Sequence, residues 1–105
     1  MDATLLFKTR FVVECKSGRV VMVYMDLFRL PPGHPDSYPE GLRFSWIAFD
    51  PDDDSLKVLF DCHDPKGAHI HINNGKPTPI KWTSVDDAQG LFFSAIREVF
   101  GDFDI

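Results

Sequence analysis

His69 and His71 are the side chains in this sequence best suited to chemistry at neutral pH, because imidazole ionises close to it. They alternate with two isoleucines, a period-two pattern that is typical of a β-strand. In such a strand the isoleucines pack inward, and the two imidazoles lie on the other face about 6–7 Å apart, toward solvent or a cleft. Asp61 and Lys66 precede this strand. Lys66 lies in a turn that contains proline and glycine, and Asp61 lies before that turn. Any chemistry is therefore expected in this stretch.

Three interpretations of the histidine pair are open. In the first, the rings are structural and hydrogen-bond their neighbours on the solvent face of a strand. In the second, they perform metal-independent phosphodiester chemistry: one imidazole takes a proton from a ribose 2′-hydroxyl, the other protonates the leaving oxygen, and Lys66 stabilises the charged phosphorane. Asp61 or Asp64 then orients a ring by accepting its other N–H. In the third, the pair binds a metal ion, with His63, Asp61 or Asp64 as a further ligand.

Charge bears on both the phosphodiester and the metal-binding interpretation. Lys66 would repel a divalent cation, so the sequence favours phosphodiester chemistry over metal binding, and no metal or cofactor is expected. The formal net charge of −5 gives no global basic field that would attract nucleic acid. A substrate phosphate would need local cations, and three candidates lie outside the histidine stretch: Arg10, Arg43 and Lys81.

The length of 105 residues suffices for one hydrophobic core, so we expect a single domain over residues 1–105. Ten phenylalanines in so short a chain predict a core of large rings. No apolar run approaches the ~20 residues of a membrane span, and the first residues lack the pattern of a signal peptide. These features predict a cytoplasmic protein with no membrane partner. Cys15 and Cys62 lie in apolar segments and are expected to be reduced and buried.

Alternating polar and apolar residues predict five or six strands, and a helix follows them. The expected strands are 5–14, 20–30, 43–50, 55–62 and 68–72, with an edge strand within 77–82. Ser84 is placed as the N-cap of a helix whose apolar stripe runs from Val85 to Phe100, and Gly101 is its stop. This order predicts an α+β fold, a mostly antiparallel five- to six-stranded sheet with the C-terminal helix packed on one face.

Two segments carry expectations of their own. The second strand is apolar on both faces over its first half, which predicts a central strand covered on both sides. Residues 31–41 contain four prolines and two glycines, so they are expected to form a long loop without regular structure. The competing class of function is a non-enzymatic binding protein, and this loop would then be its contact with the target.

The chain resembles the TumE-type family, small bacterial and archaeal proteins that act as toxin components of toxin–antitoxin pairs. The specific part of the likeness is the pattern Lys-Gly-x-His-x-His at residues 66–71, which follows Phe60-Asp61. A weaker likeness continues at Trp82-Thr83-Ser84-Val85, where the helix is capped, and in the paired N-terminal strands and the proline–glycine loop. Together these features cover most of the chain.

The resemblance implies a role more than a reaction: a toxin that a cognate DNA-binding antitoxin recognises. Combined with the histidine pair, it leads to the hypothesis of a prokaryotic toxin that acts on RNA, as a metal-independent ribonuclease or an RNA-modifying enzyme. The chain departs from the family at Ala68, Ile70 and Cys62, where Asp, Arg and Asn are common. If the Asp and the Arg take part in the family's activity, this protein is weaker or different.

Overall fold

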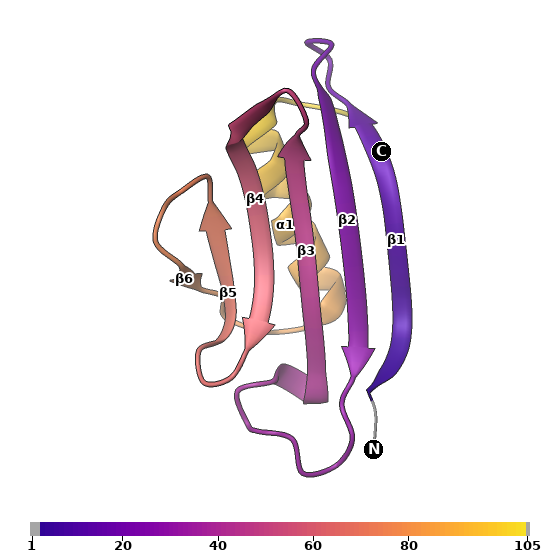
Figure 1. The fold of residues 1–105 in the computed structure, drawn as a ribbon, viewed down its shortest axis with the longest axis vertical. Coiled ribbons are helices and arrows are strands. Elements are labelled where there is room, and N and C mark those ends of the chain that lie inside the picture. The colour runs from indigo at the N-terminus through magenta and orange to yellow at the C-terminus, as the bar shows by residue number, and fades with distance from the viewer. Residues whose placement is uncertain (1–2, 105) are drawn as a thin grey trace.

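The computed structural model describes residues 3–104, and in these residues six strands precede one helix (Figure 1). The strands are β1 (Thr4–Glu14), β2 (Val20–Arg29), β3 (Leu42–Asp50), β4 (Asp53–His63), β5 (Gly67–Ile72) and β6 (Thr78–Pro79). The helix is α1 (Val85–Phe100), and a single 3-10 turn, Pro39–Gly41, leads into β3. The expected α+β class is confirmed.

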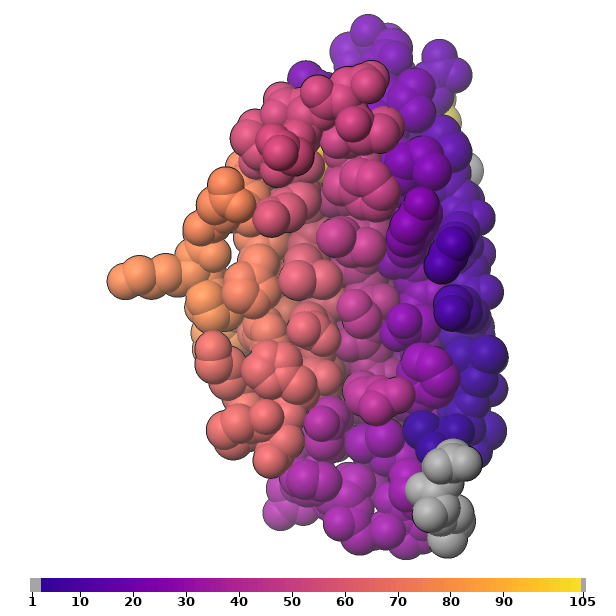
Figure 2. Space-filling model, in the orientation of Figure 1, coloured from indigo at the N-terminus to yellow at the C-terminus, as the bar shows by residue number. Residues whose placement is uncertain are grey.

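The six strands form one antiparallel sheet in which each strand pairs with the next one in the chain, in the order β1-β2-β3-β4-β5-β6. Helix α1 lies behind the middle of this sheet in Figure 1 and contacts β4 most extensively. No helix or strand of residues 3–104 packs on the opposite side, which Figure 2 shows in space-filling form. We call these two sides the covered face and the open face.

The core lies on the covered face, because alternate residues of the strands meet the apolar stripe of α1 there. Trp46 on β3 is its centre and is fully buried. Its ring centroid lies 4.8 Å from that of Phe44, 6.4 Å from that of Phe60 and 5.8 Å from that of Phe92 on the helix. Tilted and offset aromatic pairs of this kind are favourable beyond the area that they bury. The core of large rings is therefore confirmed.

The prediction that β2 is covered on both sides is wrong. Val21 and Val23 on the covered face are inaccessible to solvent, whereas Val20 on the other face is 43% exposed and Tyr24 is half-buried. The physical reason is that one helix of 16 residues can cover only one side of the sheet. The apolar residues on the other side of β2 therefore stay at the surface.

Helix α1 begins and ends where the sequence predicted. The Ser84 Oγ accepts a hydrogen bond of 3.1 Å from the backbone N–H of Asp87, as an N-cap should. Gly101 follows the helix at φ 110°, and its N–H donates to the carbonyl of Arg97. This helix is too short and too polar to span a membrane, and residues 3–104 contain no other candidate.

The last strand is much shorter than expected. β6 comprises Thr78 and Pro79, which pair with two residues of β5. Proline has no N–H to donate, so the prolines of this segment limit the hydrogen-bond ladder.

Both cysteines are free and buried, as predicted.

Candidate functional site

The β4–β5 hairpin carries the candidate site on the open face. Its register pairs Asp61 with His69 and Leu59 with His71, so both imidazoles share a face with the odd-numbered residues of β4. Ile70 lies on the covered face, opposite Phe60, and packs against the core. The predicted alternation is therefore confirmed. Ile72 is an exception to the expected inward packing, because it is 36% exposed near the end of the strand.

Three imidazoles and one carboxylate form a continuous cluster on this hairpin. The ring centroids of His63 and His69 are 4.8 Å apart, those of His69 and His71 are 5.0 Å apart, and both pairs meet edge to face. The ligand atoms of Asp61, His63 and His69 all lie within 4.8 Å of one another. His69 is thus the centre of the cluster, with a ring on either side and a carboxylate beside it.

The ring of His69 is held in one orientation. Its Nδ1 lies 2.9 Å from the carbonyl oxygen of Gly67, and because a carbonyl can only accept, Nδ1 carries the hydrogen. In the neutral ring Nε2 therefore keeps its lone pair. Nε2 has no hydrogen-bond partner, and since no fully buried polar side-chain atom in residues 3–104 lacks one, it reaches the surface.

Burial of His69 corrects one expectation from the sequence. Both imidazoles were predicted to face solvent or a cleft, but His69 is only 3% exposed, whereas His71 is half-buried. The neighbouring imidazoles and the hairpin cover most of the His69 ring, and only its edge remains accessible. A nearly buried imidazole with one free nitrogen is better ordered than a surface side chain, which favours a defined role for it.

The expected orienting carboxylates do not hold a ring. Asp61 Oδ1 accepts the backbone N–H of Cys62 at 2.8 Å. Asp64 Oδ1 accepts the hydroxyl of Ser37 at 2.7 Å, so this side chain is directed at the proline-rich loop. The Gly67 carbonyl orients the ring instead, and that contact depends on the tight turn between β4 and β5, which residue types alone do not reveal.

Gly67 is required at this turn for two reasons. Its φ of 74° is in the left-handed region, and a Cβ at this position would lie 3.1 Å from the carbonyl oxygen of Ser37. The loop of residues 31–41 is thus packed against the hairpin. A second bond joins them, from the Asp64 backbone N–H to the hydroxyl of Tyr38 at 3.3 Å. The glycine of the Lys-Gly-x-His-x-His pattern therefore has a structural cause.

The Cys62 thiol lies next to the cluster in sequence but takes no part in it. It is buried on the covered face. Burial raises its pKa to about 12, and the charge of Asp61 adds to that rise. A thiol with such a pKa stays protonated at neutral pH and is a poor nucleophile or metal ligand.

Lys66 lies exposed in the turn, one residue before Gly67. Gly67 pairs with His63 across the hairpin, so Lys66 sits at the His63 end of the cluster and not between His69 and His71. Its flexible stem would have to bend toward a substrate bound at those rings.

The three predicted substrate-binding cations lie in different places. Arg10 on β1 and Arg43 on β3 share the open face with the histidines, and their guanidinium groups lie over the rings of Tyr24 and Phe28 at 4.8 and 4.9 Å. Lys81 lies after β6 and lines a groove beside α1. The structure therefore brings two of the three cations onto the face of the site and leaves Lys81 outside it.

His63 is the member of the cluster to which sequence reasoning gave the least weight. The fourth strand was predicted to end at Cys62, whereas β4 continues to His63. The signal was present in the sequence, because the alternation of Leu59 and Asp61 reaches His63 two residues later. Extending the strand by one residue would have placed His63 on the same face as Asp61.

The cluster offers a neutral ring nitrogen of fixed orientation, a second imidazole and a carboxylate. This set suits proton transfer. Asp61, His63 and His69 also fit a divalent transition metal, because imidazole and carboxylate are its common ligands and the Gly67 carbonyl fixes the His69 tautomer that leaves Nε2 free. Comparison of the chain with protein-family models, with curated proteins and with solved structures finds no match.

Proposed function

We propose that this protein is the toxin of a two-protein toxin–antitoxin pair and cleaves RNA by acid–base catalysis at the histidine cluster. The observation that carries the chemistry is the His69 ring, nearly buried and oriented by the Gly67 carbonyl, with the His71 ring 5.0 Å away. The toxin role rests on the resemblance of residues 66–71 to the Lys-Gly-x-His-x-His pattern.

The proposed reaction is a transesterification within RNA. His69 Nε2 takes the proton of a ribose 2′-hydroxyl, and the 2′-oxygen attacks the adjacent phosphorus. The bond from phosphorus to the 5′-oxygen breaks, and protonated His71 gives its proton to that oxygen. The products are a 2′,3′-cyclic phosphate and a free 5′-hydroxyl. Asp61 stabilises the imidazolium that forms on His69, and Lys66 stabilises the charged phosphorane.

A second candidate is a metal-binding function, which the convergence of Asp61, His63 and His69 favours. Here Asp61 and the Nε2 atom of His69 would be ligands, together with a ring nitrogen of His63. A bound divalent ion would supply Lewis acidity at the open face. The two candidates assign different roles to two similar residues, because His71 belongs only to the acid–base pair and His63 only to the metal set.

The matched variants His71→Ala and His63→Ala separate these candidates. Acid–base catalysis predicts that His71→Ala lowers RNA cleavage by about 10²–10⁴-fold and abolishes growth inhibition, while His63→Ala retains both. Metal binding predicts that untagged protein contains near-stoichiometric metal by elemental analysis, that His63→Ala loses it and that His71→Ala keeps it. Circular dichroism checks that each variant is folded.

The same assays test the non-enzymatic alternative and the partner. A folded His69→Ala/His71→Ala protein that still inhibits growth fully would end the catalytic proposal, and loss of inhibition on shortening the loop of residues 31–41 would favour a binding function. Co-expression with the adjacent gene should yield a stable complex, in which the antitoxin supplies the DNA-binding surface. A neighbour that never co-purifies, combined with harmless expression of the chain alone, would contradict the toxin role.

A further inference from the structure

Two rows of side chains cross the open face from β1 to the histidines on β5. In the first row, each residue pairs with the next across neighbouring strands: Lys8, Asp26, Ser45, Asp61 and His69. In the second row, the partners are Arg10, Tyr24, Ile47, Leu59 and His71. Four strand spacings of about 4.8 Å separate the two ends, or about 19 Å. The catalytic candidates thus belong to a surface that spans five strands.

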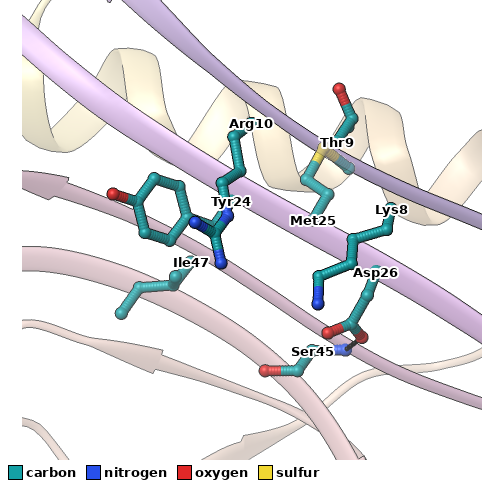
Figure 3. A pocket seen from close by; sticks show the side chains of 8 residues that line it. All are labelled: Lys8, Thr9, Arg10, Tyr24, Met25, Asp26, Ser45 and Ile47. Atoms are coloured by element: carbon teal, nitrogen blue, oxygen red, sulfur yellow. Dashed lines mark hydrogen bonds between the residues drawn. The ribbon is translucent and has the colours of Figure 1, made fainter.

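The far end of both rows is hollowed. Lys8, Arg10, Tyr24 and Asp26 line a depression of about 230 Å³ with the β3 residues Ser45 and Ile47. Figure 3 shows the side chains of Lys8, Arg10 and Tyr24 on the near side of the strands, with the helix behind them. Asp26 Oδ1 accepts the backbone N–H of Ser45 at 3.0 Å, so this carboxylate is directed at its own sheet.

The charge of the open face differs from that of the whole chain. Its four cations, Lys8, Arg10, Arg43 and Lys57, balance four carboxylates: Glu14, Asp26 and Asp61 on the strands, and Asp54, which lines a hollow with Ile47, Phe49 and Lys57. The chain as a whole carries a net charge of −5, so the excess of acid lies elsewhere. A polyanion would therefore meet the least repulsion on this face.

Aromatic rings accompany these cations. Tyr24 lies under the Arg10 guanidinium at 4.8 Å and meets the edge of Phe49 at 5.4 Å between ring centroids. Phe28 lies under Arg43 at 4.9 Å. Aromatic side chains and guanidinium planes on an uncovered sheet are the surfaces on which unpaired bases stack, and duplex RNA offers no such bases.

We infer that single-stranded RNA lies across the open face at right angles to the strands, with its reactive phosphate at His69 and His71 and a base stacked at Tyr24. The choice of RNA as the polyanion rests on the proposed function. Arg10 and Lys8 bind phosphates at the β1 end, and Ile47 and Leu59 give the intervening bases an apolar floor. The track makes Tyr24, about 14 Å from the β5 histidines by strand spacing, a substrate-binding residue.

Fluorescence anisotropy tests the track with a labelled single strand of about eight nucleotides. The probe is 2′-O-methyl RNA, which lacks the 2′-hydroxyl and cannot be cleaved by the proposed route. We expect Tyr24→Ala to weaken binding by about 5- to 100-fold and Tyr24→Phe to retain it, because stacking needs the ring and not the hydroxyl. Arg10→Gln and Lys8→Gln should each reduce the slope of log K against log salt by about 0.7, the value for one phosphate contact on a single strand.

Lys81→Gln is the matched control, since it removes one cation beside α1 and should leave binding unchanged. The inference is overturned if the wild-type protein does not bind the probe, if Tyr24→Ala binds like wild type, or if Lys81→Gln weakens binding as much as Arg10→Gln. The two proposals fail separately. Binding through Tyr24 without cleavage of ordinary RNA overturns the proposed function alone, whereas cleavage with unchanged binding in Tyr24→Ala overturns the track alone.

Discussion

The two faces of the sheet are built from the same strands but obey different requirements. On β4, Phe60 is 1% exposed against the Trp46 and Phe92 rings, whereas Leu59, the residue before it, lies half-buried on the open face. The covered face excludes water, so shape and volume decide which residues fit there. On the open face Asp61, His63 and His71 keep partial access to water, which limits the cost of placing ionisable groups there, and only His69 is nearly buried.

The requirements of the two faces meet within each strand, because neighbouring residues of a strand lie on opposite faces. Asp61 and Cys62 are neighbours in sequence, yet one faces the histidines and the other faces the core. Because side chains alternate along a strand, Asp61 is flanked by two residues that hold the core, Phe60 and Cys62. The stability of the covered face therefore supports the geometry of the open face.

The largest expected effect comes from shortening side chains on the two faces of β4. Phe60→Ala should cost about 3–5 kcal/mol of unfolding free energy, because it leaves a cavity between aromatic rings. Leu59→Ala should cost about 1 kcal/mol, because part of that side chain is already in water. Urea unfolding followed by circular dichroism measures both.

An unchanged slope of free energy against urea is the control for two-state behaviour in both variants. If Phe60→Ala fails to fold, Phe60→Leu replaces it in the comparison with Leu59→Ala. Equal costs at the two positions would contradict the distinction between the faces and would mean that another layer covers Leu59 in solution.

A smaller effect is expected at the N-terminus of the helix that covers the sheet. Ser84→Ala removes the bond to the Asp87 N–H and should cost about 1 kcal/mol, measured by the same unfolding experiment. Ser94→Ala is the matched control, because Ser94 lies exposed within α1 away from the cap. If Ser94→Ala lowers the unfolding free energy as much as Ser84→Ala does, the cap does not specifically stabilise the covering helix.

The smallest expected effect on stability concerns the segment after the helix. Its Asp102 carboxylate forms a surface ion pair with Lys16 in the turn between β1 and β2, at 3.0 Å from Nζ to Oδ2. The hydrogen bond from Lys16 lowers the pKa of Asp102 below 3.8, and the same bond raises the pKa of Lys16 above 10.5. Asp102 contributes stability above its unfolded pKa, and this is lost as pH falls through its folded value. Lys16 contributes stability below its unfolded pKa, and this is lost as pH rises through its folded value.

Asp102→Asn should therefore lower Tm slightly between about pH 5 and 9 and leave it unchanged at about pH 2. High salt should remove the difference, because both groups are exposed. Asp104→Asn is the control, since that carboxylate lies 3.9 Å from Lys16 and is 92% exposed. A decrease of Tm at pH 2 as large as at pH 7 would contradict the ion pair as its cause.

The sequence by itself determined the elements and their faces. Period-two alternation on β3 separated Trp46 from Ile47, and the three- and four-residue spacing of apolar residues with Ser84 before it located α1. These signals are local, because burial of one face of a strand or helix imposes its own period. The same alternation placed His69 and His71 on one side of their strand.

Only the tertiary structure decided what surrounds those histidines. Contact between Gly67 and the His69 ring depends on the conformation of a turn, and the exposure of β2 depends on how far one helix extends over the sheet. The row that joins Arg10 to His71 depends on four successive strand registers. A residue's own strand determines which face the residue lies on, but its neighbours on that face come from other strands. The sequence of one strand does not specify which strand it pairs with or in which register.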